Sequence, residues 1–228
     1  MELRYGTERI LILAPHADDE VLGCGGLMAR ARALGNDVKV VLATTGDTEY
    51  LDGRIVTQED RVREMNQALA TLTIPETEVL VPGRDSELDM VPLSDIVTAI
   101  DRVLREWKPT VVLFPYPSFH QDHQRLYDAC LAALRPRLDG SWHTAALYEY
   151  PNIVWQPNGL PSSGELYVQL DDEALAKKVL ALEEHASQML YGKYTITPEA
   201  VRQWAMFRGF EIGATYAEKF YLLRQVIS

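Results

Sequence analysis

Two short segments of the sequence concentrate side chains that bind metals and transfer protons. The first runs from Pro15 to Glu20 (PHADDE) and the second from His120 to His123 (HQDH). Catalytic zinc sites commonly use two histidines and one carboxylate as protein ligands and keep one position for water. A water bound to such a metal loses a proton near neutral pH and can attack a carbonyl group. The residue types of the two segments therefore suit a hydrolytic zinc site.

The other polar side chains of these segments suit the proton transfers of an amide hydrolysis. A carboxylate that lies beside the metal without binding it can take the proton of the attacking water. A further histidine can stabilise the oxyanion or protonate the leaving group. The residue types leave open which of four carboxylates binds the metal: Asp18, Asp19, Glu20 and Asp122.

Each segment taken alone also has a simpler explanation. Consecutive acids after a strand often form the first turn of a helix, where they offset the positive end of the helix dipole. An H-x-x-H spacing also arises by chance. The chain contains five histidines, however, and three of them fall in these two segments. Their joint occurrence favours a shared site over surface decoration.

A shared site requires a fold that brings the two segments together. The first half of the chain alternates short apolar runs, which predict buried strands, with longer helical patterns. We expect strands at Arg9–Pro15, Asp37–Ala43, Glu78–Val81 and Thr110–Pro115, and helices at Val21–Leu34, Glu59–Leu72, Leu93–Trp107 and Asp122–Leu134. This alternation predicts an α/β fold: a Rossmann-like, doubly wound, mostly parallel sheet with helices on both faces.

The expected strand order places both segments at one crevice. In the common doubly wound order 3-2-1-4-5, the crossover direction reverses between strands 1 and 4, and ligands bind beyond their carboxyl ends. His16 follows the first strand, and His120 follows the fourth. The topology therefore predicts that the two segments face each other.

The second half of the chain is less regular. Strands are expected at Ala145–Tyr150 and Leu166–Leu170, a loop at Pro151–Gly164 and a long helix at Glu173–Met189. No linker separates a second domain, so we expect residues 1–228 to form a single domain.

Composition excludes several other classes of protein. With 22 basic and 33 acidic residues, the formal net charge of −11 disfavours binding to nucleic acid or to an anionic membrane. No apolar stretch approaches the roughly 20 residues of a membrane span. The charged N-terminus lacks the apolar core of a signal peptide. Two cysteines, Cys24 and Cys130, do not make a disulfide framework, and we expect a cytoplasmic location.

The two segments resemble the signature of the PIG-L/LmbE-like N-acetylglucosaminyl deacetylases. The family's first motif usually reads A-H-P-D-D-E, with Ala17 here in place of its proline, and its second reads H-x-D-H. Ala17 removes a rigid turn residue but no chemical group. Weaker similarities extend over nearly the whole chain, at Thr45-Gly46-Asp47, Arg61 with Glu64, Tyr148-Glu149, Ser187-Gln188 and Ala217-Glu218.

The resemblance implies which side chains hold the metal. His16, Asp19 and His123 would bind Zn²⁺, or another divalent transition metal in its place. Asp18 would be the general base that activates the water. The choice of Asp19 as the ligand and Asp18 as the base comes from the resemblance and not from the residue types.

The resemblance also implies roles around the metal. His120 would stabilise the oxyanion or act as an acid, and Asp122 would orient His120, as carboxylates commonly do for a working imidazole. Arg61 would contact the substrate, and by a looser match so would Asp85.

The implied function is zinc-dependent removal of an N-acetyl group from an N-acetylglucosamine-type amino sugar or its conjugate. Two alternatives remain: an amidase for a different acyl group in a thiol-sugar conjugate, and a non-catalytic module that binds a nucleotide or sugar. The acidic first segment argues against the module, because it would repel a phosphate. The rest of the substrate stays open, and so does the oligomeric state, for which a homo-oligomer is one option.

Overall fold

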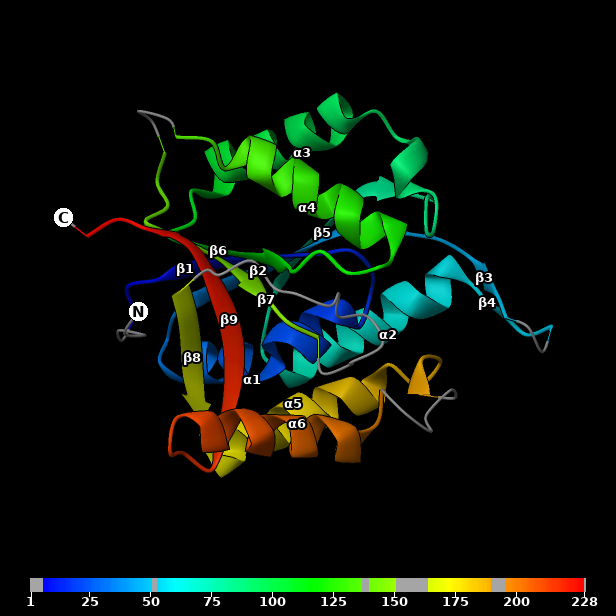
Figure 1. The fold of residues 1–228 in the computed structure, drawn as a ribbon. Helices are drawn as coiled ribbons and strands as arrows, with labels where there is room; N and C mark the ends of the chain where they lie inside the picture. The colour runs from blue at the N-terminus through cyan, green and yellow to red at the C-terminus, as the bar shows by residue number, and fades with distance from the viewer. Residues whose placement is uncertain (1–5, 51–52, 137–139, 151–163, 190–195, 228) are drawn as a thin grey trace.

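A mostly parallel sheet of seven strands forms the centre of the protein (Figure 1). The computed structural model describes residues 6–50, 53–136, 140–150, 164–189 and 196–227. The strand order is β5-β2-β1-β6-β7-β9-β8. The five parallel strands are β1 (Arg9–Ala14), β2 (Asp37–Thr45), β5 (Glu76–Pro82), β6 (Val111–Pro115) and β7 (Thr144–Tyr148). At one edge of the sheet, β9 (Tyr216–Gln225) runs antiparallel to both of its neighbours, β7 and β8 (Gly164–Leu170).

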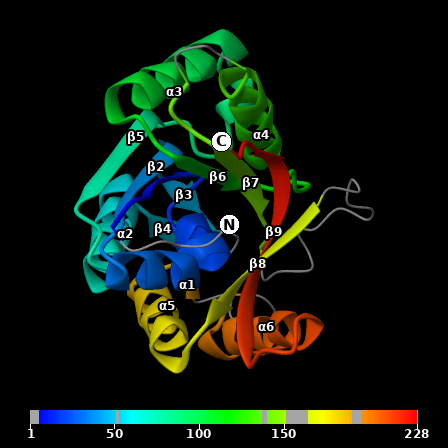
Figure 2. The same ribbon diagram turned by 90° about the vertical axis from the view of Figure 1, so that its left-hand side faces the viewer.

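Helices cover both faces of this sheet, as Figures 1 and 2 show. One face carries α3 (Leu93–Trp107) and α4 (Gln121–Ala133), and the other carries α1 (Asp19–Ala33), α2 (Gln58–Thr71), α5 (Asp172–Glu184) and α6 (Pro198–Glu211). Alternate residues of β1 therefore enter different cores: Ile10 and Ile12 join one buried cluster, and Leu11 and Leu13 join the other. Burial on both faces explains why the central strands read as continuous apolar runs.

The predicted α/β fold is confirmed, and so is the order of the first five strands. Numbered along the chain without the hairpin of β3 (Thr48–Glu49) and β4 (Ile55–Val56), which forms a separate sheet, these strands lie in the order 3-2-1-4-5. In this order β1 pairs with both β2 and β6. The segment that begins at Pro15 leaves the end of β1 and enters α1, whereas the segment at His120 leaves β6 and enters α4. Because α1 and α4 cover opposite faces, the two segments flank the crevice between β1 and β6.

The second half differs from expectation at three places. The helix expected to reach Met189 ends at Glu184, and residues 185–189 form a turn. Both α6 and β9 were missed, and β9 inserts between β7 and β8 through pairings that no local pattern reveals. Of the loop expected at Pro151–Gly164, residues 151–163 lie outside the described part of the chain, and Gly164 begins β8.

Glycines bring α1 close to its neighbours. A Cβ at Gly23 would lie 2.2 Å from Cδ2 of Tyr148 on β7, and one at Gly26 would lie 2.4 Å from Cδ1 of Leu170 on β8. The glycines after the first segment therefore allow close packing of the helix.

A small hairpin lies beyond the end of β2. It pairs β3 (Thr48–Glu49) with β4 (Ile55–Val56), and a short 3₁₀ helix, η1 (Leu88–Met90), follows β5. Among the helices of the described residues, none is long and apolar enough to cross a membrane.

Candidate active site

A cleft of about 270 Å³ opens at the carboxyl ends of the parallel strands. Its walls come from both sequence segments, the β3–β4 hairpin, α2 and the loop after β5. Tyr150, Gln188 and Ile196 from the second half of the chain complete the lining. The topology thus places the cleft where the sequence predicts a site.

Three buried side chains converge in the lining of this cleft: His16, Asp19 and His123. Their potential ligand atoms all lie within 4.8 Å of one another. Asp19 Oδ2 is 3.3 Å from His16 Nδ1 and 3.5 Å from His123 Nε2. Two imidazole nitrogens and a carboxylate oxygen around one point are the donor set of many catalytic zinc sites. The residues present therefore fit a divalent transition metal.

The nitrogens of the two imidazoles that face away from Asp19 also have partners. His16 Nε2 lies 2.8 Å from Asp122 Oδ2, and His123 Nδ1 lies 2.7 Å from the hydroxyl of Ser118. Such outer contacts fix the orientation of ligating imidazoles. They leave His16 Nδ1 and His123 Nε2 directed at Asp19.

Asp122 makes a different contact from the one we expected. We expected its carboxylate to orient His120, but its Oδ2 contacts His16 and accepts the backbone N–H of Ser86 at 2.7 Å. Its Oδ1 accepts the backbone N–H of Leu88 at 2.9 Å. What reaches His120 Nδ1 is the backbone N–H of Asp122, at 3.2 Å. The sequence could not reveal this change of partner, because α4 directs the Asp122 carboxylate toward η1 and the end of β1.

A second combination of residues also meets the metal-site distance: His16, His120 and Asp122. The Asp122 carboxylate is fully buried and already receives three hydrogen bonds. Asp19 instead lines the cleft between two imidazoles. The geometry favours the set that contains Asp19.

Charge in the cluster attracts a cation. Burial opposes a charge on His16, yet hydrogen bonds to Asp122 and Asp19 raise its pKa to about 10. Burial lowers the pKa of His123 to about 4, so this imidazole keeps a lone pair near neutral pH. A divalent cation at this point would neutralise the carboxylates as the His16 proton does.

Asp18 lines the cleft beside the three residues. Its backbone has a φ of 114°, and its N–H donates to Glu20 Oε2 at 3.0 Å. Burial, together with the negative charge of Asp19, raises the pKa of Asp18 to about 7. A carboxylate with a pKa near the working pH is suited to general base catalysis.

His120 lies next to the imidazoles of the cluster. Its ring centroid is 4.9 Å from that of His16 and 4.9 Å from that of His123. Burial and the charge of His16 lower the pKa of His120, so its ring is neutral near pH 7. Because His120 Nδ1 accepts the N–H of Asp122, the ring proton belongs on Nε2.

The two residues expected to bind substrate pair with each other. Arg61 on α2 forms an ion pair with Asp85, and both side chains are 8% exposed at the cleft. Arg61 also approaches the carbonyl of Ala17 at 3.5 Å. A Cβ at Gly46 would lie 2.9 Å from Cβ of Asp85, so this glycine makes room for the pair.

Two residues of the site were missed in the sequence. Ser118 lies two residues before the second segment, and His185 lies two residues before the Ser187-Gln188 pair. His185 Nε2 is 3.1 Å from Glu20 Oε1, and both side chains are buried. The one available signal was that His185 is among only five histidines.

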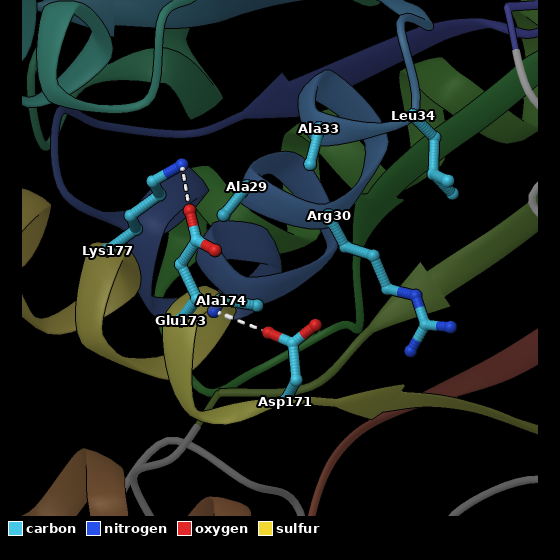
Figure 3. A pocket seen from close by; sticks show the side chains of 8 residues that line it. All are labelled: Ala29, Arg30, Ala33, Leu34, Asp171, Glu173, Ala174 and Lys177. Carbon is cyan, nitrogen blue, oxygen red and sulfur yellow. Dashed lines mark hydrogen bonds and ion pairs between the residues drawn. The ribbon is translucent and has the colours of Figure 1, made fainter.

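Another cavity, of about 160 Å³, lies at the opposite end of α1 (Figure 3). Asp171 there accepts the N–H of Ala174 at 2.8 Å and caps α5, while Glu173 pairs with Lys177 at 2.9 Å. These contacts stabilise the start of a helix, and the described residues that line this cavity form no candidate metal site.

Comparison with known proteins places the chain in a family. Residues 11–134 match the PIG-L family, described as GlcNAc-PI de-N-acetylase. The diacetylchitobiose deacetylase of Thermococcus kodakarensis is 25% identical over 93% of this chain and 82% of its own length.

One further relative and one solved structure extend the comparison. The 1D-myo-inositol 2-acetamido-2-deoxy-alpha-D-glucopyranoside deacetylase of Tsukamurella paurometabola is 30% identical over 80% of this chain and 84% of its own length. The crystal structure of a protein from Thermus thermophilus superposes with a TM-score of 0.75. It is 24% identical and covers 97% of both chains, which shows the shared fold.

Proposed function

Because the chain belongs to the PIG-L family of GlcNAc-PI de-N-acetylases, we propose that it is a zinc-dependent N-deacetylase. It removes the acetyl group from an N-acetylglucosamine-type sugar or its conjugate. One observation carries the proposal: the ligand atoms of His16, Asp19 and His123 lie within 4.8 Å of one another in the cleft that Asp18 lines.

His16 would bind the metal through Nδ1, His123 through Nε2 and Asp19 through Oδ2. The contacts of the opposite nitrogens with Asp122 and Ser118 support this choice of atoms. When bound, the metal lowers the pKa of a water and polarises the acetyl carbonyl. A different divalent transition metal would suit the same donors.

Asp18 acts as the base in this proposal. Its carboxylate takes a proton from the water whose oxygen attacks the acetyl carbonyl carbon. As the C–N bond breaks, the same proton passes to the departing nitrogen, which leaves as a free amine, and acetate is released. The raised pKa of Asp18 supports both the acceptance and the return of the proton.

His120 stabilises the developing oxyanion. Because Nδ1 accepts the N–H of Asp122, the ring proton of His120 lies on Nε2, and the side chain lines the cleft. A positioned donor of this kind commonly contributes about 10²–10³ in rate. Its lowered pKa supports hydrogen-bond donation over the transfer of a whole proton.

Arg61 and Asp85 contact the sugar in this proposal. Their buried ion pair presents a fixed guanidinium and carboxylate at the cleft, and such groups suit sugar hydroxyls and the acetamido oxygen. The relatives named above act on diacetylchitobiose and on an inositol-linked 2-acetamido sugar. Those names support an N-acetylglucosamine-type substrate here. A cytoplasmic location remains part of the proposal, in keeping with two buried free cysteines.

Acetate release tests the function. The protein should release acetate from N,N′-diacetylchitobiose or N-acetylglucosamine, lose this activity when a chelator removes the metal, and regain it with added Zn²⁺. Unchanged turnover after verified metal removal would exclude the metal mechanism. Matched substrates with propionyl and larger acyl groups would reveal the alternative amidase. Absence of stoichiometric metal would favour a non-catalytic binding module.

The Asp18→Asn variant tests the base separately. Asparagine keeps the shape of the side chain and tolerates positive φ, so the fold and the bound metal should persist while kcat falls by about 10²–10⁴. Metal content and acetate release are measured together, with exposed Asp89→Asn as the control. Undiminished kcat in a metal-loaded variant would remove Asp18 from this role.

A further inference from the structure

We infer that His185 is a positioning residue that acts through Glu20 to hold the loop presenting Asp18 to the cleft. The inference rests on the proposed function, in which Asp18 is the base. His185 is a buried histidine outside the proposed metal site, and the proposed mechanism gives it no role.

The loop at Asp18 needs such support because its backbone is strained. Asp18 has a φ of 114° and a ψ of −31°, a region that residues other than glycine rarely adopt. Strained residues persist only where the surrounding contacts hold them. The carbonyl of Asp18 accepts the N–H groups of Val21 and Leu22, at 3.1 and 2.9 Å, which joins it to the first turn of α1.

Within the described part of the chain, the N–H of Asp18 donates to the side chain of Glu20. It donates to Glu20 Oε2 at 3.0 Å, and the Glu20 side chain is fully buried. A buried carboxylate needs donors for its oxygens. The position of Glu20 therefore decides whether Asp18 keeps its backbone conformation.

His185 supplies the second contact of Glu20. Its Nε2 lies 3.1 Å from Glu20 Oε1, and its side chain is 1% exposed. Burial alone would lower the pKa of His185, but the hydrogen bond and the charge of Glu20 raise it. Without His185, Oε1 of Glu20 would lose its buried donor. A side-chain conformation in which Glu20 turns away from Asp18 would then become more favourable.

Packing does not explain why this position is a histidine. His185 Nδ1 is buried and has no hydrogen-bond partner among the described residues. An apolar side chain would fill the space without leaving a polar atom unpaired. The contact with Glu20 is what the imidazole adds.

The turn that carries His185 is anchored from two sides. The carbonyl of His185 accepts the N–H groups of Gln188 and Met189, at 3.0 and 3.3 Å, which closes the turn after α5. The N–H and hydroxyl of Ser187 donate to Glu64 on α2, at 3.1 and 2.7 Å. The turn thus joins α2, which carries Arg61, to the loop of Asp18.

A matched pair of variants tests the inference. In His185→Gln, the amide nitrogen replaces Nε2 and can still donate to Glu20. In His185→Asn, the shorter side chain cannot reach it. On N,N′-diacetylchitobiose, the Asn variant should lose about 10–100-fold in kcat with KM within about twofold, whereas the Gln variant should keep most of the wild-type kcat.

Two controls test whether His185 acts on Asp18 through Glu20. Once Glu20→Ala is present, adding His185→Asn should cause no further loss in kcat, because the contact is already absent. His143 is also paired with a glutamate, Glu8 at 3.2 Å, but it precedes β7 at the opposite end of the sheet. The His143→Asn variant should therefore keep wild-type kcat.

Amide hydrogen exchange at Asp18, measured on the metal-free protein, gives a readout that needs no activity. Exchange should be faster in His185→Asn than in wild type and near wild type in His185→Gln. Equal kcat and equal exchange in the Gln and Asn variants would overturn the inference. If wild type releases no acetate from any acetamido sugar, the proposed function fails, while exchange still decides the inference. If the Asn variant does not fold, Glu20→Ala replaces it, with the same expected losses.

Discussion

At the residue scale, the two imidazoles of the proposed metal site are held by different partners. His16 contacts the buried carboxylate of Asp122, whereas His123 contacts the hydroxyl of Ser118. Ser118 Oγ also accepts the N–H of His120 at 3.2 Å. One hydroxyl therefore contacts the imidazole of His123 and the backbone of His120.

Substitution of Ser118 should weaken metal binding. In Ser118→Ala, His123 loses the partner of its Nδ1, and loss of such an outer contact typically lowers metal affinity about 10–100-fold. Competition with a chromophoric chelator measures the Kd for Zn²⁺. Ser94→Ala, an exposed serine bonded to Asp95 at 3.2 Å, serves as the control. A Kd equal to that of wild type would show that Ser118 does not orient the ligand.

At the element scale, α1 is shaped to fit its neighbours. Its glycines face Tyr148, Lys178 and Leu170, so the helix approaches the sheet and α5 more closely than alanines would allow. Lys178 donates to the carbonyl of Leu22 at 2.7 Å, and Glu218 accepts the N–H groups of Gly26 and Leu27. The helix that begins at the proposed metal site is thus held along its length by buried polar contacts.

The Gly23→Ala variant should be less stable than wild type. Alanine normally favours a helix interior by about 1 kcal/mol over glycine, but here its Cβ would overlap the ring of Tyr148. Tyr148 is fixed by its hydroxyl on the carbonyl of Leu13 at 3.0 Å. Overpacking of this kind costs about 1–3 kcal/mol, so a net loss is expected in urea unfolding. Gly164→Ala, with no atom nearer than 3.8 Å, should be neutral, and a gain in Gly23→Ala would contradict the packing argument.

The contact of His185, in the turn after α5, with Glu20 on α1 should also make stability depend on pH. His185 has a pKa raised above 6.5 in the folded protein, so its contribution is complete below that pH and is lost as pH rises through the folded value. The difference in unfolding free energy between wild type and His185→Gln should therefore shrink from pH 6 to pH 9. Urea unfolding at several pH values measures it. A difference that stays constant or grows would show that the pair is not charged.

At the scale of the whole molecule, both halves of the chain share one sheet. β9, at the end of the chain, pairs with β7 on one side and β8 on the other. The buried ion pair of Glu149 with Arg208, at 2.5 Å, joins α6 to the residue after β7. We therefore propose that residues 1–228 form a single domain.

A single domain should unfold in one step. Calorimetry of the metal-free protein should show one transition, with equal calorimetric and van't Hoff enthalpies. Circular dichroism and tryptophan fluorescence should give the same midpoint. Two resolved transitions, or midpoints that differ between the two probes, would divide the chain into independent units.

The sequence by itself determined the framework of the site. Apolar periodicity can be read from neighbouring residues and predicts the strands. Once the strand order is assumed, the rule that ligands bind at the switch point predicts where the site lies. Those two arguments were enough to bring His16 and His123 to one crevice. They did not reveal α6 or β9, because the edge pairing of β9 joins residues distant in sequence.

Only the tertiary structure decided how the carboxylates divide their contacts. Asp18 and Asp19 are adjacent and chemically alike, and the backbone turn at Asp18, with its φ of 114°, separates their directions. Asp19 then lies between two imidazoles, while Asp122 turns to His16 and not to the ring of His120 as expected. Composition and spacing carry no information on side-chain direction. Direction comes from backbone dihedrals and from buried partners such as Glu20, which the folded chain alone brings together.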